Sequence, residues 1–168
     1  METVISSTQY WLLLEVVFAM ALGALIGIER EIARKPAGLR THMLVAGAGA
    51  LLVGLSQTAV TASASHFDPN IIQTDPIRIM EAVVTGISFL GAGTIVRYQA
   101  DKAIEGLTTA ASVLIAGGIG IAVALSQFAL ASGVTIIVLI ILYGIAYIER
   151  WLEKRNLKVQ DQDVHQRT

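Results

Sequence analysis

The chain has 168 residues, of which 54% are hydrophobic and 15% are charged, whereas a soluble domain carries about 25% charged residues. This composition excludes an ordinary soluble globular protein. Twelve Lys and Arg against 13 Asp and Glu leave no basic excess for binding nucleic acid, and the absence of cysteine excludes disulfides, thiolate catalysis and cysteine-ligated metals.

Five hydrophobic stretches predict an all-α, polytopic membrane protein, because a membrane-spanning helix needs about 20 apolar residues. The first two predicted helices cover residues 10–28 and 41–63. The third is short, because only Ala82 to Val96 is free of charge. Asp75 and Pro76 supply a helix cap and a first-turn proline, so we expect this helix to begin earlier and to cover 76–97.

The next stretch is too long for one helix. Residues 106–148 hold 43 residues without Asp, Glu, Lys or Arg, which is about 64 Å of helix, twice the hydrocarbon thickness. A turn between Ser126 and Gly133 divides it into helices 107–125 and 132–149. The sequence therefore predicts a transmembrane domain over 1–150, followed by a short tail, 151–168.

The charges predict how this domain is oriented. Eleven of the 12 Lys and Arg fall on one side of the five predicted helices, and only Arg78 falls on the other. The positive-inside rule then places the N-terminus outside and the C-terminal tail in the cytoplasm.

An offset of 68 residues aligns the chain with itself. It pairs Leu22-Gly23-Ala24 with Leu90-Gly91-Ala92, and Gly38-Leu39 with Gly106-Leu107. Either the matches are accidental, since these segments use few residue types, or helices 1–2 and 3–4 form a parallel repeat about an axis along the membrane normal. Small residues at four-residue spacing predict close helix packing; they are Ala19, Gly23 and Gly27 in the first helix and Ser112, Ala116, Gly120 and Ala124 in the fourth.

Two sets of polar residues are candidate sites on the outer side. Glu15 lies within the first hydrophobic stretch, and it is either a proton or cation relay or a carboxylate near enough to the surface to be hydrated. Asp75, Arg78 and Glu81 share one side of the start of the third helix. They are either a capped helix end with an ion pair, or a site whose two carboxylates bind a divalent cation such as Mg²⁺.

The cytoplasmic loops contain a further set of charged residues. Glu29, Arg30, Arg40 and Glu105 form either an inner ionic gate or a loop that only sets the topology. Thr41, and Thr108 or Thr109, are expected either to cap the helices that follow these loops or to hydrogen-bond back to the backbone at the helix start. No catalytic motif is visible, so we expect no enzymatic activity and no cofactor.

Three blocks together resemble the MgtC/SapB family of bacterial inner-membrane proteins: GALIGIEREIARKPAGLRTHMLV (23–45), DPIRIMEAVVTGISFLGAGTIVR (75–97) and EGLTTAAS (105–112). The resemblance implies a small helical membrane domain linked to magnesium homeostasis and virulence. Its family positions here are Glu29, Arg30, Arg40, Thr41, Asp75, Arg78, Gly86, Gly91, Gly93, Gly106, Thr108 and Thr109. Glu81 departs from the usual glutamine, Ser88 from glycine, and Val113-Leu114 from a frequent tryptophan. Many members continue into a soluble cytoplasmic domain, so no ligand-sensing role is carried over to the tail 151–168.

These observations leave two mechanisms open. The chain is either an ion transporter or channel, or a regulator that binds a larger membrane complex such as the rotary ATP synthase. Because 168 residues leave little room for a transport cavity, transport favours a homodimer. The expected partners are therefore the lipid bilayer, a second copy or a larger membrane complex, and no nucleic acid.

Overall fold

A computed structural model describes the backbone of residues 2–64, 76–97 and 104–144. Within these ranges the chain forms α1 (Glu2–Ile32), α2 (Leu39–Ala64), α3 (Pro76–Ala92), α4 (Leu107–Ala124) and a last helix, Phe128–Gly144. Two-residue strands β1 (Val96–Arg97) and β2 (Ile104–Glu105) pair antiparallel ahead of α4. Segments of α1, α2 and α4 are long and apolar enough to cross a membrane. The prediction of an all-α, polytopic membrane protein is confirmed.

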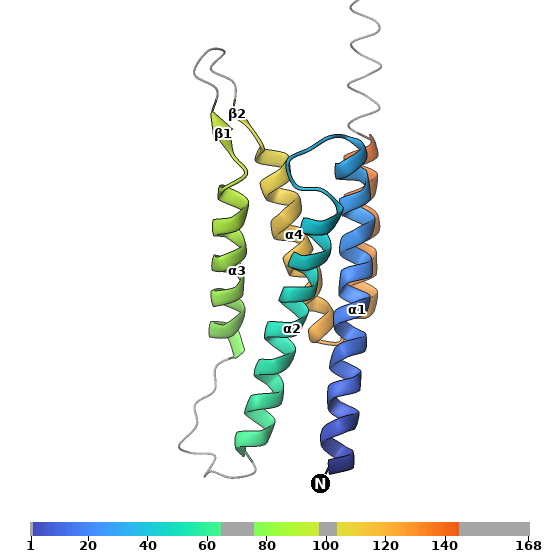
Figure 1. Ribbon diagram of the computed structural model, residues 1–168, viewed down its shortest axis with the longest axis vertical. Helices are drawn as coiled ribbons and strands as arrows, with labels where there is room; N and C mark the ends of the chain where they lie inside the picture. The colour runs from blue at the N-terminus through green and yellow to red at the C-terminus, as the bar shows by residue number, and fades with distance from the viewer. Residues whose placement is uncertain (1, 65–75, 98–103, 145–168) are drawn as a thin grey trace, which may run out of the picture.

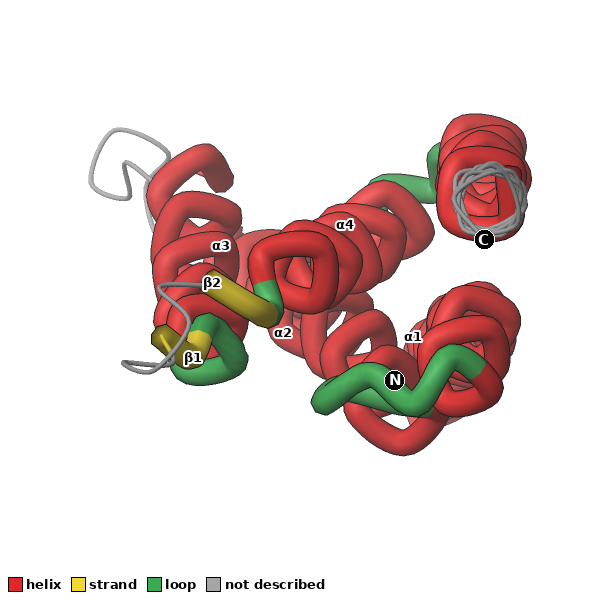
Figure 2. The backbone as a smooth tube through the Cα atoms, turned by 90° about the horizontal axis from the view of Figure 1, so that it is seen from above, coloured by secondary structure: helices red, strands yellow, loops and turns green. Residues whose placement is uncertain are grey.

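The helices alternate in direction (Figure 1). α1, α3 and the last helix run one way, and α2 and α4 run the other way. Seen from above, α2 and α4 lie at the centre, with α3 on one side and with α1 and the last helix on the other (Figure 2). The buried apolar side chains form two clusters, and α2 and α4 contribute to both.

Small residues allow the two central helices to approach closely. A methyl group on Gly120 would lie 2.0 Å from the carbonyl oxygen of Ala46, and one on Gly49 would lie 2.7 Å from that of Gly117. The seven residues of the predicted small-residue stripes are all buried. Because membrane helices associate by van der Waals packing rather than by the hydrophobic effect, such backbone contact holds the bundle together.

The helix contacts agree with the repeat. A methyl group on Gly23 of α1 would lie 2.5 Å from the carbonyl oxygen of His42 in α2. At the offset of 68 residues, a methyl group on Gly91 of α3 would lie 3.3 Å from the carbonyl oxygen of Ala110 in α4. Gly49 and Gly117, which are themselves repeat partners, meet where α2 and α4 cross. These three contacts fit the approximate symmetry of the predicted parallel repeat.

The last helix breaks this symmetry. It covers the surface made by α1 and α4, where Leu22, Ile119 and Val123 are 8%, 2% and 0% exposed. Their repeat partners on α3 and α2, Leu90, Leu51 and Leu55, are 49%, 41% and 49% exposed. We refer to the latter surface as the α2/α3 face.

Several predicted helix boundaries are wrong, among them the end of the third helix and the start of the last. The third helix starts at Pro76 as expected but ends at Ala92 rather than at residue 97. The Thr94 hydroxyl and amide both donate to the carbonyl oxygen of Gly91, which turns the chain into β1. The last helix begins at Phe128 rather than at residue 132, and its predicted end at 149 lies outside the described residues.

α1 and α4 end in the same type of cap, which explains both the short turn before Phe128 and the length of α1. At the end of α4, Gln127 donates to Ala122 and Ser126 donates to Val123, with Ser126 at φ 58°. At the end of α1, Lys35 donates to Arg30 and Arg34 donates to Glu31, with Arg34 at φ 53°. These are Schellman caps, in which a left-handed residue satisfies the last carbonyl groups. The first helix therefore continues to Ile32, beyond its predicted end at 28.

Candidate functional site

The extension of α1 places two charged residues inside the helix rather than in the loop where they were expected. Glu29 and Arg30 are each 4% exposed. Arg30 donates from both Nε and Nη2 to the carboxylate of Glu29, with Nη2 2.8 Å from Oε1. A two-bond contact of this kind is the geometry in which a buried guanidinium and a buried carboxylate neutralise one another best.

His42 is the second buried ionisable side chain at this end of the bundle. It lies in the first turn of α2 and is 0% exposed. Its Nδ1 lies 2.9 Å from the carbonyl oxygen of Gly38, and its Nε2 lies 3.0 Å from Oγ of Ser112 in α4. The Ser112 hydroxyl also lies 2.9 Å from the carbonyl oxygen of Thr109. A hydrogen-bonded chain therefore connects α2 to α4.

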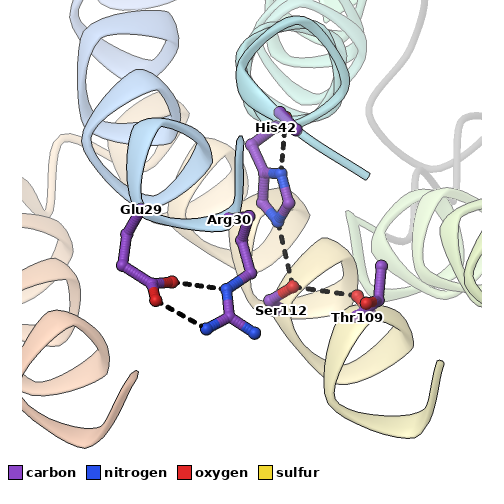
Figure 3. Close-up of polar contacts among 6 residues, drawn as sticks. Glu29, Arg30, His42, Thr109 and Ser112 are labelled. Atoms are coloured by element: carbon purple, nitrogen blue, oxygen red, sulfur yellow. Dashed lines mark hydrogen bonds and ion pairs between the residues drawn. The ribbon is translucent and has the colours of Figure 1, made fainter. Parts of the chain in front are cut away.

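These groups lie together where α1, α2 and α4 meet, and Figure 3 shows Arg30 beside the chain from His42 to Thr109. Glu29 and Arg30 are also the charged groups that act electrostatically on His42. We refer to Glu29, Arg30, His42, Thr109 and Ser112 as the buried polar cluster. Ionisable side chains are rare within membrane helices and mark ion or proton sites more often than structural ones.

The loop before the cluster is closed by a carboxylate from α1. Glu31 accepts a hydrogen bond from the amide of Leu39 at 2.8 Å and so caps the start of α2. A methyl group on Gly38 would lie 2.7 Å from this carboxylate. Sequence analysis expected Thr41 to cap this helix. The carboxylate from the preceding helix supplies that cap because the tight turn brings it over the first amide.

The cap expected from Thr108 or Thr109 is likewise absent from α4. Gly106, the residue before α4, has φ 91° and lies so close to Thr94 that a methyl group would be 2.0 Å from the Thr94 carbonyl oxygen. No side chain caps this helix start. The Thr109 side chain is buried and Thr108 is exposed.

The structure brings together only part of the predicted inner gate. Glu29 and Arg30 pair with each other, whereas Arg40 is exposed. Glu105 belongs to β2, and its side chain lies outside the described residues. Among the other family positions, Gly91 is buried against α4, Thr41 is half-buried, and Gly93 lies just past the end of α3.

The predicted outer site is described only in part. Asp75 lies outside the described residues. Arg78 and Glu81 are exposed on α3, and Glu15 is half-buried on α1. Within the parts of the chain that the structure describes, no three His, Asp or Glu side chains are close enough together to hold a metal ion.

His42 and Ser112 are the functional candidates that the sequence did not reveal. A lone histidine at the start of an apolar stretch carries no spacing signal, and Ser112 belongs to a small-residue stripe. The side chain of Ser112 is small enough to allow close helix packing, and its hydroxyl can hydrogen-bond to the imidazole of His42.

The chain matches the MgtC family over residues 16–151. It is 41% identical to Protein MgtC of Salmonella typhimurium over 76% of this chain and 49% of that protein. It is 32% identical to Protein SapB of Bacillus subtilis over 89% of this chain and 63% of that protein. It is 35% identical to a putative magnesium transporter, YhiD, of Escherichia coli over 84% of this chain and 63% of that protein. The chain thus spans less than two thirds of each relative, and no solved structure matches it.

Proposed function

The chain belongs to the MgtC family, and from this premise we propose that it is a bacterial inner-membrane protein that affects Mg²⁺ or proton balance without acting as an enzyme. The observation that carries the proposal is the buried polar cluster. Three helices that are apolar along most of their length each contribute to one buried group of charged and hydrogen-bonded side chains.

The energetic cost of this cluster supports a functional role. Glu29 and Arg30 lie in the last turn of α1, where burying a charge costs less than the about 2.5–3.5 kcal/mol that it costs at the centre of a membrane helix. Two apolar residues would still fill their space without any such cost. A pair that only held helices together could be replaced by packing. Retaining both charges beside His42 is expected where ions or protons are handled.

Transport is our first candidate mechanism. It fits the printed description of the relative from Escherichia coli as a putative magnesium transporter. In this mechanism the buried polar cluster is the inner gate, and Asp75 and Glu81, with Arg78 as a displaceable counter-ion, bind Mg²⁺ at the outer end of α3. Glu15 supplies a third carboxylate on the outer side. The proposed orientation has the N-terminus outside, and a homodimer supplies the room that one chain lacks.

Regulation of another membrane complex is the second candidate, and the α2/α3 face favours it. Leu51, Leu55 and Leu90 are exposed there, whereas their repeat partners are covered by the last helix. Because these side chains are exposed where their repeat partners are covered, the α2/α3 face offers a place for a larger membrane protein to bind. The rotary ATP synthase is one such complex.

Ion flux into liposomes that contain only this purified protein tests the proposal. We expect a flux of Mg²⁺ or protons that is lost in the double variant Glu29→Gln, Arg30→Gln. The two glutamines are uncharged but close in size to the residues that they replace. The double variant Asp75→Asn, Arg78→Gln tests the outer site, and we expect it to abolish the flux as well. Gly118→Ala is the matched control, because Gly118 is exposed and a methyl group there meets nothing within 4 Å.

Each outcome separates the candidates. Flux that both paired variants abolish and Gly118→Ala preserves supports transport. Absence of flux under every gradient excludes transport and leaves regulation, which then requires that a larger membrane complex be recovered with the intact protein and lost when Leu51 and Leu55 are replaced by bulkier tryptophan. Absence of both flux and complex contradicts the proposed function.

A further inference from the structure

We propose that His42 is a proton-binding site, in which the imidazole takes up a second proton without movement of any heavy atom because the Ser112 hydroxyl turns from the ring to the Thr109 carbonyl. The proposal deepens the function proposed above, and its physiological use rests on that function. The site itself rests only on the hydrogen bonds that His42 makes.

The partner of Nδ1 fixes one ring proton. Gly38 meets Nδ1 through its carbonyl oxygen at 2.9 Å, and a carbonyl oxygen can only accept. Nδ1 therefore carries hydrogen in every state of the site. In the neutral ring Nε2 is then bare and accepts a hydrogen bond from the hydroxyl of Ser112, 3.0 Å away.

The partner of Nε2 can also serve the charged ring. Oγ of Ser112 lies within bonding distance of both Nε2 and the Thr109 carbonyl oxygen, at 3.0 and 2.9 Å, but a hydroxyl has a single proton to donate. When Nε2 gains a proton it donates to Oγ, and the hydroxyl then donates to Thr109. That carbonyl oxygen has two lone pairs and can accept a second bond in addition to that of its own helix. Both protonation states are thus fully hydrogen-bonded.

Binding of the second proton to His42 changes the net charge of the buried polar cluster. From α4 the ring meets Ser112, whose hydroxyl is bonded to the Thr109 carbonyl oxygen, and neither residue carries a charge. From α1 come Glu29 and Arg30, which neutralise each other. On α2 itself, Arg40 is exposed to the surroundings. The buried polar cluster therefore changes from neutral to singly positive when His42 binds the second proton.

The test is ¹⁵N nuclear magnetic resonance of the full chain in lipid nanodiscs with labelled histidine. The chain has three histidines, so His42→Gln identifies the signals of His42. Between about pH 8 and pH 5, the range in which histidine changes charge, we expect Nδ1 to stay protonated and Nε2 to change from bare to protonated. A bare Nδ1 in the neutral ring, or no change at either nitrogen over this range, overturns the proposal.

Ser112→Ala tests the rotating hydroxyl. A hydrogen bond to the charged ring is stronger than one to the neutral ring, so this variant should need an about ten-fold higher proton concentration for the same protonated fraction. Thr135→Ala is the matched control, because Thr135 is also a buried hydroxyl but donates to Ala131 in its own helix, at 2.8 Å. Equal effects of the two variants refute the role of Ser112. The titration can succeed while the flux assay fails, so failure of one proposal is distinguishable from failure of the other.

Discussion

The contact between α2 and α4 at Gly120 makes the sharpest prediction for stability. In Gly120→Ala the added methyl group would lie 2.0 Å from the carbonyl oxygen of Ala46 and 2.9 Å from the amide nitrogen of Ala50. Carbon atoms in proteins essentially never come closer than 3.0 Å in such contacts. The two helices must therefore separate by about 1 Å at this point, because backbone atoms, unlike the tip of a side chain, cannot turn aside.

The size of the effect follows from this separation. Overfilling a packed interior costs about 1–3 kcal/mol, and a contact against backbone belongs at the upper end of that range. Moving the helices apart also weakens neighbouring contacts such as Gly49 against Gly117, and in a membrane no hydrophobic effect compensates for them. The gain in helix propensity from Gly to Ala, about 1 kcal/mol, is common to any helical glycine. We therefore compare Gly120→Ala with Gly118→Ala on the same helix.

The assay is reversible unfolding of the purified protein in mixed micelles, followed by helical circular dichroism. We expect Gly120→Ala to be less stable than Gly118→Ala by about 3 kcal/mol, and Gly118→Ala to be at least as stable as the parent because its methyl group meets nothing within 4 Å. Equal stabilities of the two variants would refute the view that backbone contact between α2 and α4 holds the bundle together.

Three further sets of variants use the same unfolding assay, and one labelling experiment tests orientation. Glu29→Gln leaves the Arg30 charge buried and unpaired and should cost about 3–5 kcal/mol, whereas adding Arg30→Gln should recover part of the loss; no recovery would argue against the pair. Glu31→Ala removes the cap of α2 and should cost about 1 kcal/mol, while Glu31→Gln, which keeps an oxygen, should cost less. Arg34→Gly relieves a left-handed residue and should gain about 1 kcal/mol, unlike Arg34→Ala. A cysteine at position 68 should react with a membrane-impermeant reagent from outside, and reaction only from the cytoplasm would reverse the proposed orientation.

The number of helices could be predicted because the bilayer fixes the length of each one. The absence of charge from residues 106–148 required two helices on length alone, and Asp75-Pro76 indicated the start of α3. The helix ends were predicted less well. Arg34 and Ser126 adopt left-handed conformations that usually require glycine, so the Schellman caps at the ends of α1 and α4 leave no mark in the sequence.

The candidate site was predicted in composition but not in geometry. Glu29 and Arg30 were recognised as polar residues of interest, but their charges suggested a loop, because a single charge is costly within a helix. Each residue satisfies the other, which allows α1 to continue through both. The contact between His42 and Ser112 joins residues 70 positions apart, and such a contact depends on how helices pack against each other, which hydrophobic periodicity does not determine.

The glycines and the buried polar cluster depend on each other. The bond between His42 and Ser112 spans 3.0 Å between two helices, and neither side chain is long. It can form only because α2 and α4 meet with backbone against backbone at Gly49 and Gly120, while Gly23 allows α1 to press against the carbonyl oxygen of His42. A side chain at any of these glycines would move apart the helices that carry the cluster. Gly120→Ala should therefore alter the proton binding of His42 and lower the stability of the bundle, whereas Gly118→Ala should leave the proton binding unchanged and should not lower the stability.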